Sequence, residues 1–119
     1  DETLVTWNGS WDLRFLVIRS LRHRISPPFV ISPYFKRYTT SPHFDCKAVL
    51  MQDWAFRGTG EGLDEWSTFL GYGGKSDGWD GSKVYPAFLE GRHDEIKQYC
   101  VAHVARTAEI YNAINLSFR

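Results

Sequence analysis

The sequence predicts an α/β fold, in which helices pack on a sheet of strands. A short β-prone run, Leu4 to Trp7, ends at an Asn-Gly pair and is followed by a helical pattern. A second β-prone run begins at His43, and a long amphipathic pattern extends from Glu95 to Asn112. A strand, a tight turn and a helix in this order are typical of α/β units, so these observations together predict the fold class.

Composition limits the architecture and the partners. The 119 residues are enough for a single domain, residues 1–119, and with 43% hydrophobic residues a buried core is expected. The 14 basic and 14 acidic side chains cancel, which excludes a global attraction to nucleic acid or membrane. Two cysteines are too few for a disulfide scaffold. No apolar run approaches the ~20 residues that cross a bilayer and no leader opens the chain, so we expect a cytoplasmic protein without a membrane partner.

A helix is expected after the Asn-Gly turn, from about Leu13 to Arg24. The pair Asn8-Gly9 tolerates positive φ and indicates a sharp turn, after which Ser10 or Asp12 can cap the helix. The apolar stripe of this helix consists of Leu13, Leu16, Val17, Leu21 and Ile25. Its polar side carries Arg14, Arg19, Arg22, His23 and Arg24. This basic side is either a solvated surface or a surface that contacts phosphates.

The middle of the chain is expected to contain a loop, a strand and a helix. Three prolines interrupt Ser26 to Tyr38, which is therefore expected to be extended. The alternation in His43 to Val49 suits a short strand, with a helix from Leu50. A Gly-rich connection follows from Arg57 to Gly62.

Two further short helices are predicted before the long one. Leu63 to Leu70 has the apolar period of a helix and ends at Gly71, and Ser82 to Glu90 ends at Gly91. The segment between them, Gly73 to Gly81, is a loop rich in Gly, Asp and Lys.

The long pattern from Glu95 to Asn112 carries the first candidate site. The apolar positions of one buried helical face are Ile96, Tyr99, Cys100, Val104, Thr107, Ile110 and Tyr111. Tyr99 and His103 are four residues apart, so their side chains are expected to project side by side from one surface. They are either packed core residues or half of a site.

Two other groups of residues are candidates for chemistry. Asp12 follows a strand end and a turn, where α/β folds gather ligands and metals, although a helix cap is the simpler interpretation. Two pairs of residues, each three apart, could supply the four ligands of a tetrahedral zinc site. These are His43 and Cys46, and Cys100 and His103. A buried cysteine that acts only as a small apolar residue is the alternative for each pair.

Five segments, taken in order, resemble one family over nearly the whole chain. They are LVTWNGSWDLRFL, HFDCKAVL, LDEWSTFLGYGGK, DGWDGSKVYPAFLEG and YCVAHVART. The chain resembles the predicted 3′-5′ exonucleases related to the proofreading domain of family B DNA polymerases, within the DEDD, ribonuclease H-like superfamily. The resemblance implies a ribonuclease H-like exonuclease fold and hydrolysis of single-stranded DNA from a 3′ end with Mg²⁺ or Mn²⁺.

The resemblance also implies roles for individual residues. Asp12 takes the place of a carboxylate that holds a divalent ion, and Tyr99 matches a tyrosine that orients the attacking water. The turn at Trp7, Asn8 and Gly9 would lie beside the terminal nucleotide, where stacking and backbone contacts tolerate any base. Arg14 and Lys75 are the basic side chains expected to contact the strand.

Three departures from the family pattern affect the metal site. The first exonuclease motif, Asp-x-Glu, has no counterpart, and we expect a fold without its first strands, because the chain begins downstream of that motif. His103 stands where an aspartate is expected, and magnesium favours imidazole poorly. The interval from Asn8 to Asp12 is one residue shorter than in the usual family pattern. His103 is therefore either a substitute metal ligand or a bystander, and a standard two-magnesium site is not expected.

Two functions follow from these observations. The first is a metal-dependent 3′-5′ exonuclease-like domain that acts on DNA ends. The alternative is a degenerate, non-catalytic module that binds nucleic acid or assembles with other subunits. A strand at Leu4 to Trp7 without neighbours on one side would expose a sheet edge, so a homo-oligomer or a larger assembly is also expected.

Overall fold

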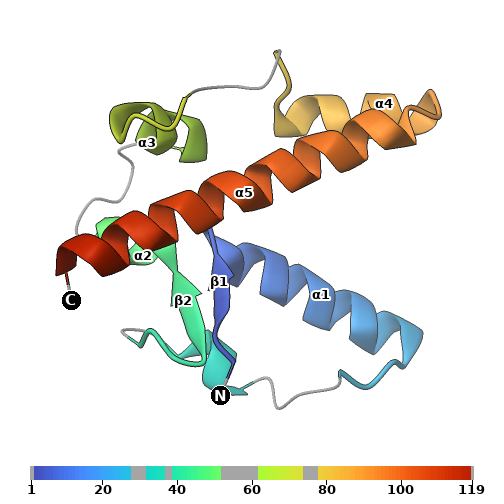
Figure 1. The fold of residues 1–119 in the computed structure, drawn as a ribbon. Coiled ribbons are helices and arrows are strands. Elements are labelled where there is room, and N and C mark those ends of the chain that lie inside the picture. Colours follow the sequence, from blue (N-terminus) through green and yellow to red (C-terminus); the bar gives the residue numbers. More distant parts are fainter. Residues whose placement is uncertain (1, 28–31, 37–38, 52–61, 74–77, 119) are drawn as a thin grey trace. The chain divides into compact units, whose positions relative to one another are not determined.

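The computed structural model describes residues 2–27, 32–36, 39–51, 62–73 and 78–118, and its ribbon is drawn in Figure 1. The chain forms two compact units, Asp1–Thr59 (unit 1) and Gly60–Arg119 (unit 2). The described residues of unit 1 combine helices with two parallel strands, and those of unit 2 are helical. A mixture of helices and a small parallel sheet agrees with the predicted α/β class.

Unit 1 is built around a parallel pair of strands joined by a helix. Its elements are, in order, β1 (Leu4–Thr6), α1 (Gly9–His23), the 3₁₀ helix η1 (Ser32–Phe35), β2 (His43–Asp45) and α2 (Cys46–Leu50). The strands lie side by side, with Leu4 opposite His43 and Thr6 opposite Asp45 (Figure 1). Parallel strands need a crossover connection, and α1 belongs to it. The carboxyl ends of both strands therefore lie at one edge of the sheet.

The first helix begins four residues earlier than the sequence indicated. Asn8 takes the left-handed conformation, with φ 57°, and α1 starts at Gly9. Gly9 is buried against the preceding strand, where an added Cβ would lie 2.2 Å from Thr6 Oγ1. The predicted start at Leu13 was therefore wrong. Neither Ser10 nor Asp12 caps the helix, because both already lie in its first turn.

The second strand is shorter than expected, and its helix begins sooner. Asp45 ends β2, and its side chain accepts hydrogen bonds from the backbone N–H groups of Lys47 and Ala48. An aspartate cap of this kind starts a helix at the next residue. The predicted strand to Val49 and the predicted helix from Leu50 are corrected to β2 and α2.

Unit 2 consists of helices that contact one long helix. Its elements are α3 (Leu63–Phe69), the 3₁₀ helix η2 (Gly81–Lys83), α4 (Val84–Leu89) and α5 (His93–Phe118). Both α3 and α4 contact α5. The two predicted short helices are confirmed, and the glycines after them, Gly71 and Gly91, have φ values of 84° and 76°.

The long helix α5 buries or half-buries five of the seven positions expected on its apolar face, and exposes the other two. Thr107, Ile110 and Ile114 are buried, whereas Cys100 and Val104 are exposed. Cys100 and Val104 each follow a half-buried residue by one position, which turns them about 100° away around the helix. Including these two positions in the buried face was therefore wrong, although the helix itself is confirmed and extended.

Several expectations fall on segments whose structure is not described. Residues 28–31 and 37–38 of the proline-rich loop are among them, as are most of the Gly-rich connection at 57–62 and Lys75. Among the described helices, none has the length and apolar character needed to cross a membrane.

Candidate functional site

The turn after β1 is bound to the end of β2 by one carboxylate. Asp45 Oδ1 accepts from the backbone N–H of Asn8 at 2.8 Å, and also from those of Lys47 and Ala48 at 3.1 and 3.4 Å. Hydrogen bonds to a charged acceptor are stronger than neutral ones. Asp45 therefore fixes the Asn8 turn and the start of α2 at the same edge of the sheet.

A buried histidine joins the same two strands to each other and to η1. His43 Nδ1 lies 3.0 Å from the carbonyl oxygen of Tyr34, and His43 Nε2 lies 2.7 Å from Thr6 Oγ1. A carbonyl oxygen only accepts, so Nδ1 carries a proton, and in the neutral ring Nε2 accepts from the Thr6 hydroxyl. Both ring nitrogens of His43 are thus occupied by contacts that join β1, β2 and η1.

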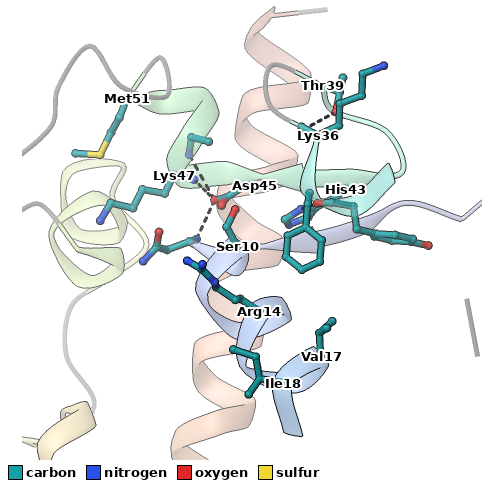
Figure 2. Close-up of a pocket in the computed structure, with 14 residues that line it drawn as sticks. Ser10, Arg14, Val17, Ile18, Lys36, Thr39, His43, Asp45, Lys47 and Met51 are labelled. Carbon is teal, nitrogen blue, oxygen red and sulfur yellow. Dashed lines mark hydrogen bonds between the residues drawn. The ribbon is translucent and has the colours of Figure 1, made fainter. Parts of the chain in front are cut away.

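A cavity of about 850 Å³ opens beside these hydrogen bonds, entirely within unit 1. Its polar lining includes Arg14, Lys36, Lys47 and Asp45, and Figure 2 shows Arg14 beside Ser10 near the Asp45 carboxylate. The remaining lining residues are Asn8, Val17, Ile18, Tyr34, Phe35, Thr39, His43, Ala48 and Met51. The cavity therefore combines three cations with aromatic and apolar walls.

The residues expected to act at this edge of the sheet divide between the cavity and other surfaces. Asn8 and Arg14 line the cavity. Asp12 is exposed in the first turn of α1 and does not line it. The lining residues of α1 recur at positions 10, 14, 17 and 18, and at 3.6 residues per turn Asp12 projects from the opposite side of the helix. Trp7 is half-buried outside the cavity lining, and Gly9 is buried.

In unit 2, Tyr99 and His103 do lie side by side on one face of α5, as their spacing predicted. Their ring centroids are 6.2 Å apart, with an edge-to-face angle of 80°. Trp79 stacks on Tyr99 at 5.7 Å and 27°. Trp79 was not singled out in the sequence, because no local signal connects it with a residue 20 positions later.

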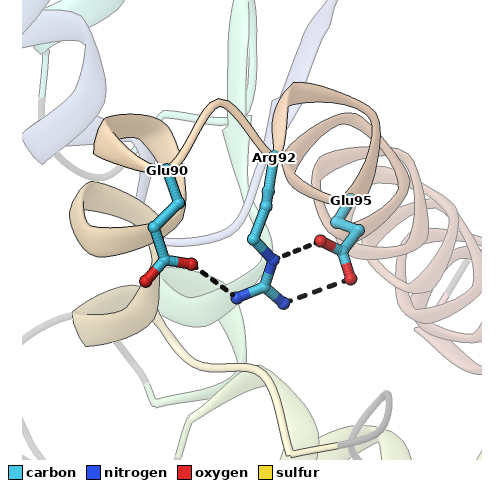
Figure 3. A network of polar contacts seen from close by, with 3 residues as sticks. All are labelled: Glu90, Arg92 and Glu95. Carbon is cyan, nitrogen blue, oxygen red and sulfur yellow. Dashed lines mark hydrogen bonds and ion pairs between the residues drawn. The ribbon is translucent and has the colours of Figure 1, made fainter.

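The Trp79 ring is also in contact with an arginine that forms ion pairs. The Arg92 guanidinium lies 5.4 Å from the Trp79 ring centroid. Arg92 also pairs with Glu90 at 3.3 Å and with Glu95, as Figure 3 shows. Tyr99, Trp79 and Arg92 therefore form a stack between the start of α5 and the loop before η2.

The Tyr99 hydroxyl is held in its protonated form. Burial raises the pKa of Tyr99, and the carboxylates of Asp64 and Asp80 raise it further, while Arg106 acts in the opposite direction. Arg106 forms an ion pair with Asp64, with both side chains partly buried. A phenol with a raised pKa is a hydrogen-bond donor at neutral pH.

The donor groups do not fit a metal centre. Within the described ranges, no group of three or more His, Cys, Asp and Glu side chains could hold an ion. For the zinc hypothesis, His43 already uses both ring nitrogens. Cys46 is fully buried, and this burial, with a smaller contribution from Asp45, raises the pKa of its thiol to about 12. Cys46 therefore fits the alternative interpretation, a buried cysteine that acts as a small apolar residue.

One comparison with known proteins gives a match. A family model described as "Predicted 3'-5' exonuclease related to the exonuclease domain of PolB" matches residues 1–117. No curated protein and no solved structure matches the chain.

Proposed function

Because the chain belongs to the family of predicted 3′-5′ exonucleases related to the exonuclease domain of PolB, we propose that it is a ribonuclease H-like domain that acts on the 3′ end of single-stranded DNA. Membership of this family supports a nucleic acid as the substrate. The observation that carries the proposal is the strand–turn–helix unit of β1, Asn8 and α1, which leaves Asp12 exposed in the first turn of the helix.

The proposal gives each residue a chemical role. Asp12 is a ligand for Mg²⁺ or Mn²⁺, the kind of ion that activates water and neutralises phosphodiester oxygens in such hydrolases. A carboxylate and a phosphodiester repel each other, which is why a cation is needed between them. Tyr99, as a protonated phenol, donates a hydrogen bond to a water or to a phosphate oxygen. His103, beside Tyr99, is a substitute ligand or a neutral neighbour.

The strand itself would be held by residues of the turn and by basic side chains. Asn8, Trp7 and Gly9 form the turn next to the terminal nucleotide, and Arg14 and Lys75 contact phosphates. Arg14 is exposed on α1 and therefore accessible to a strand in solution.

The absence of a cluster of metal-binding side chains among the described residues favours a second function, a non-catalytic module. The described residues do not gather three metal-binding side chains, and an Asp-x-Glu pair occurs nowhere in the 119 residues. These observations support a domain that binds nucleic acid, or assembles with other chains, without cleaving it.

A nuclease assay distinguishes the two functions. Single-stranded DNA labelled at its 5′ end is incubated with the full chain and Mg²⁺ or Mn²⁺, and shortened products are resolved by length. We expect Asp12→Ala to lose more activity than the roughly 10–100-fold typical of residues that only support a metal ligand. The matched control is Asp94→Ala, which removes an exposed carboxylate from the first turn of α5 and should leave the rate unchanged.

Activity that survives Asp12→Ala would show that Asp12 is not a metal ligand. DNA binding without shortening in either metal, measured by fluorescence anisotropy, would favour the non-catalytic module.

A further inference from the structure

The ring of Tyr99 is oriented by a tryptophan from another part of unit 2. Trp79 stacks on Tyr99, with ring centroids 5.7 Å apart and an angle of 27° between the rings. His103 packs edge to face against Tyr99 as well, but both residues belong to α5. A contact within one helix does not tie a side chain to the rest of the fold. Trp79 lies before η2, so its contact fixes the phenol relative to a second element.

The loop that carries Trp79 is closed by its own hydrogen bonds. Gly78, directly before Trp79, has a φ of 74°, and its carbonyl oxygen accepts a hydrogen bond from the Lys83 ammonium. Asp80, directly after Trp79, accepts from the backbone N–H of Ser82 at 2.8 Å and so caps η2. The backbone on both sides of Trp79 is therefore held within the loop, before any substrate binds.

The turn between α4 and α5 holds the Trp79 ring as well. The Arg92 guanidinium lies 5.4 Å from the ring centroid. Arg92 is kept there by two carboxylates, since Glu90 Oε2 lies 3.3 Å from Nη1 and Glu95 Oε1 lies 3.1 Å from Nη2 (Figure 3). A guanidinium and the face of an aromatic ring attract each other electrostatically. The contacts thus run from this turn through Arg92 and Trp79 to the Tyr99 ring.

We propose that Trp79 is a positioning residue for Tyr99, which holds the phenol ring in one orientation and covers part of it from water. The inference rests on the proposed function, in which the Tyr99 hydroxyl donates a hydrogen bond to water or to a phosphate oxygen. Such a donor must keep its distance and angle to the reacting group, so a ring that turns freely loses rate. Burial is also the first cause of the raised pKa of Tyr99, and the stacked indole contributes to that burial.

The first measurement needs neither metal nor DNA. The tyrosine rings of the full chain are labelled for NMR, and the Tyr99 signal is the one missing from Tyr99→Phe. We expect Trp79→Leu to lower the pKa of Tyr99 toward the ordinary value of a tyrosine, because water reaches the hydroxyl, and to speed the flipping of the ring. Trp79→Phe should keep the raised pKa and the slow ring, because a phenyl ring still stacks on the phenol.

The second measurement follows the shortening of a labelled oligothymidylate in the presence of Mn²⁺. We expect Trp79→Leu to lower kcat by roughly 10–100-fold and to leave KM unchanged, since a displacement of about 1 Å can cost about 100-fold in rate. Trp79→Phe should retain most of the wild-type kcat. A raised KM at unchanged kcat would show that Trp79 contacts the strand itself, and would overturn the positioning role. Trp79→Met, which is apolar and has no ring, replaces Trp79→Leu if that variant fails to fold.

The matched control is Trp11→Leu. Trp11 is 68% exposed on α1 in unit 1, where it stacks on Phe15. Its replacement also removes one tryptophan from a ring stack, and should leave the pKa and the ring signals of Tyr99 unchanged. The proposal is overturned if Trp79→Leu leaves the Tyr99 signals unchanged, or if Trp79→Phe alters them as much as Trp79→Leu does.

The two measurements also separate this inference from the exonuclease function. If the wild type shortens no DNA with either metal, the exonuclease function fails, while the NMR signals still decide whether Trp79 fixes the phenol. If the wild type is active and Trp79→Leu changes the Tyr99 signals but not kcat, the orientation of Tyr99 has no part in the reaction and the positioning role is overturned.

Discussion

Arg92 and Arg106 in unit 2 are paired with carboxylates, whereas the cations that line the unit 1 cavity are not. Arg106 pairs with Asp64 in a partly buried position, with 17% and 28% of the two side chains exposed. Arg14, Lys36 and Lys47 meet no carboxylate partner in the described ion pairs. In unit 1 the carboxylate at the site, Asp45, binds backbone N–H groups instead.

The difference separates charges that support the fold from charges that are available to a ligand. An arginine whose guanidinium is already paired gives up that pair when it binds a phosphate. A cation without a protein partner gives up only water. On this basis the basic surface of unit 1, and not Arg92 or Arg106 of unit 2, is the place to look for a phosphate contact.

The largest expected effect concerns the two aspartates that cap a helix. Asp45→Ala removes the acceptor of three N–H groups on both sides of the strand edge and should lower the free energy of unfolding by roughly 3 kcal/mol. Asp80→Ala, which removes the cap of η2, should cost only about 1 kcal/mol. Urea denaturation of both variants measures the difference. If both variants lose the same free energy of unfolding, the hydrogen bond from Asn8 N–H to Asp45 contributes nothing beyond the helix cap.

Over a single pH unit, a smaller effect is expected from the buried thiol next to Asp45. The pKa of Cys46 is raised from 9.0 to about 12, first by burial and then by the Asp45 carboxylate. Below pH 9 the thiol is protonated in both the folded and the unfolded chain, so the free energy of unfolding does not depend on this group there. Stability then falls by up to about 1.4 kcal/mol per pH unit between pH 9 and 12, because the unfolded chain releases the proton first.

The measurement is the denaturation midpoint as a function of pH. Cys46→Ala should lack the additional loss above pH 9. The exposed Cys100 serves as the internal control, since Cys100→Ala should leave the alkaline slope unchanged. A slope that persists in Cys46→Ala would assign it to another group.

The smallest expected effect compares the paired Arg106 of unit 2 with Arg14 of unit 1, which has no carboxylate partner among the described ion pairs. A double-mutant cycle of Arg106→Gln and Asp64→Asn should give a coupling of about 1 kcal/mol in the free energy of unfolding. Arg14→Gln should change that free energy by less than about 0.5 kcal/mol, as is usual for an exposed side chain without such a partner. A destabilisation by Arg14→Gln as large as that by Arg106→Gln would remove the contrast between the two units.

The sequence predicted what depends on near neighbours. The strand before Asn8, the helices before Gly71 and Gly91, and the adjacency of Tyr99 and His103 follow from spacings of a few residues. The helix that contains Tyr99 was likewise found from its period.

What depends on distant contacts was not predicted. Asp45 and Asn8 are 37 residues apart, and nothing local to either indicates their hydrogen bond. The cavity was missed for the same reason, because its lining is assembled from α1, η1, β2 and α2, which are separated in the sequence. The start of α1 was misplaced because it is set by contact between Gly9 and Thr6, and not by a polar cap.

The Asn8-Gly9 pair has a consequence for how the family motif is interpreted. Asn8 is needed for a left-handed backbone that few side chains adopt readily, and Gly9 because any Cβ would collide with Thr6. Both identities are therefore required by folding, before any contact with a nucleotide. A descendant of this chain that had lost all affinity for DNA would still be selected to keep the pair, so the motif records the shape of the turn and not the retention of activity.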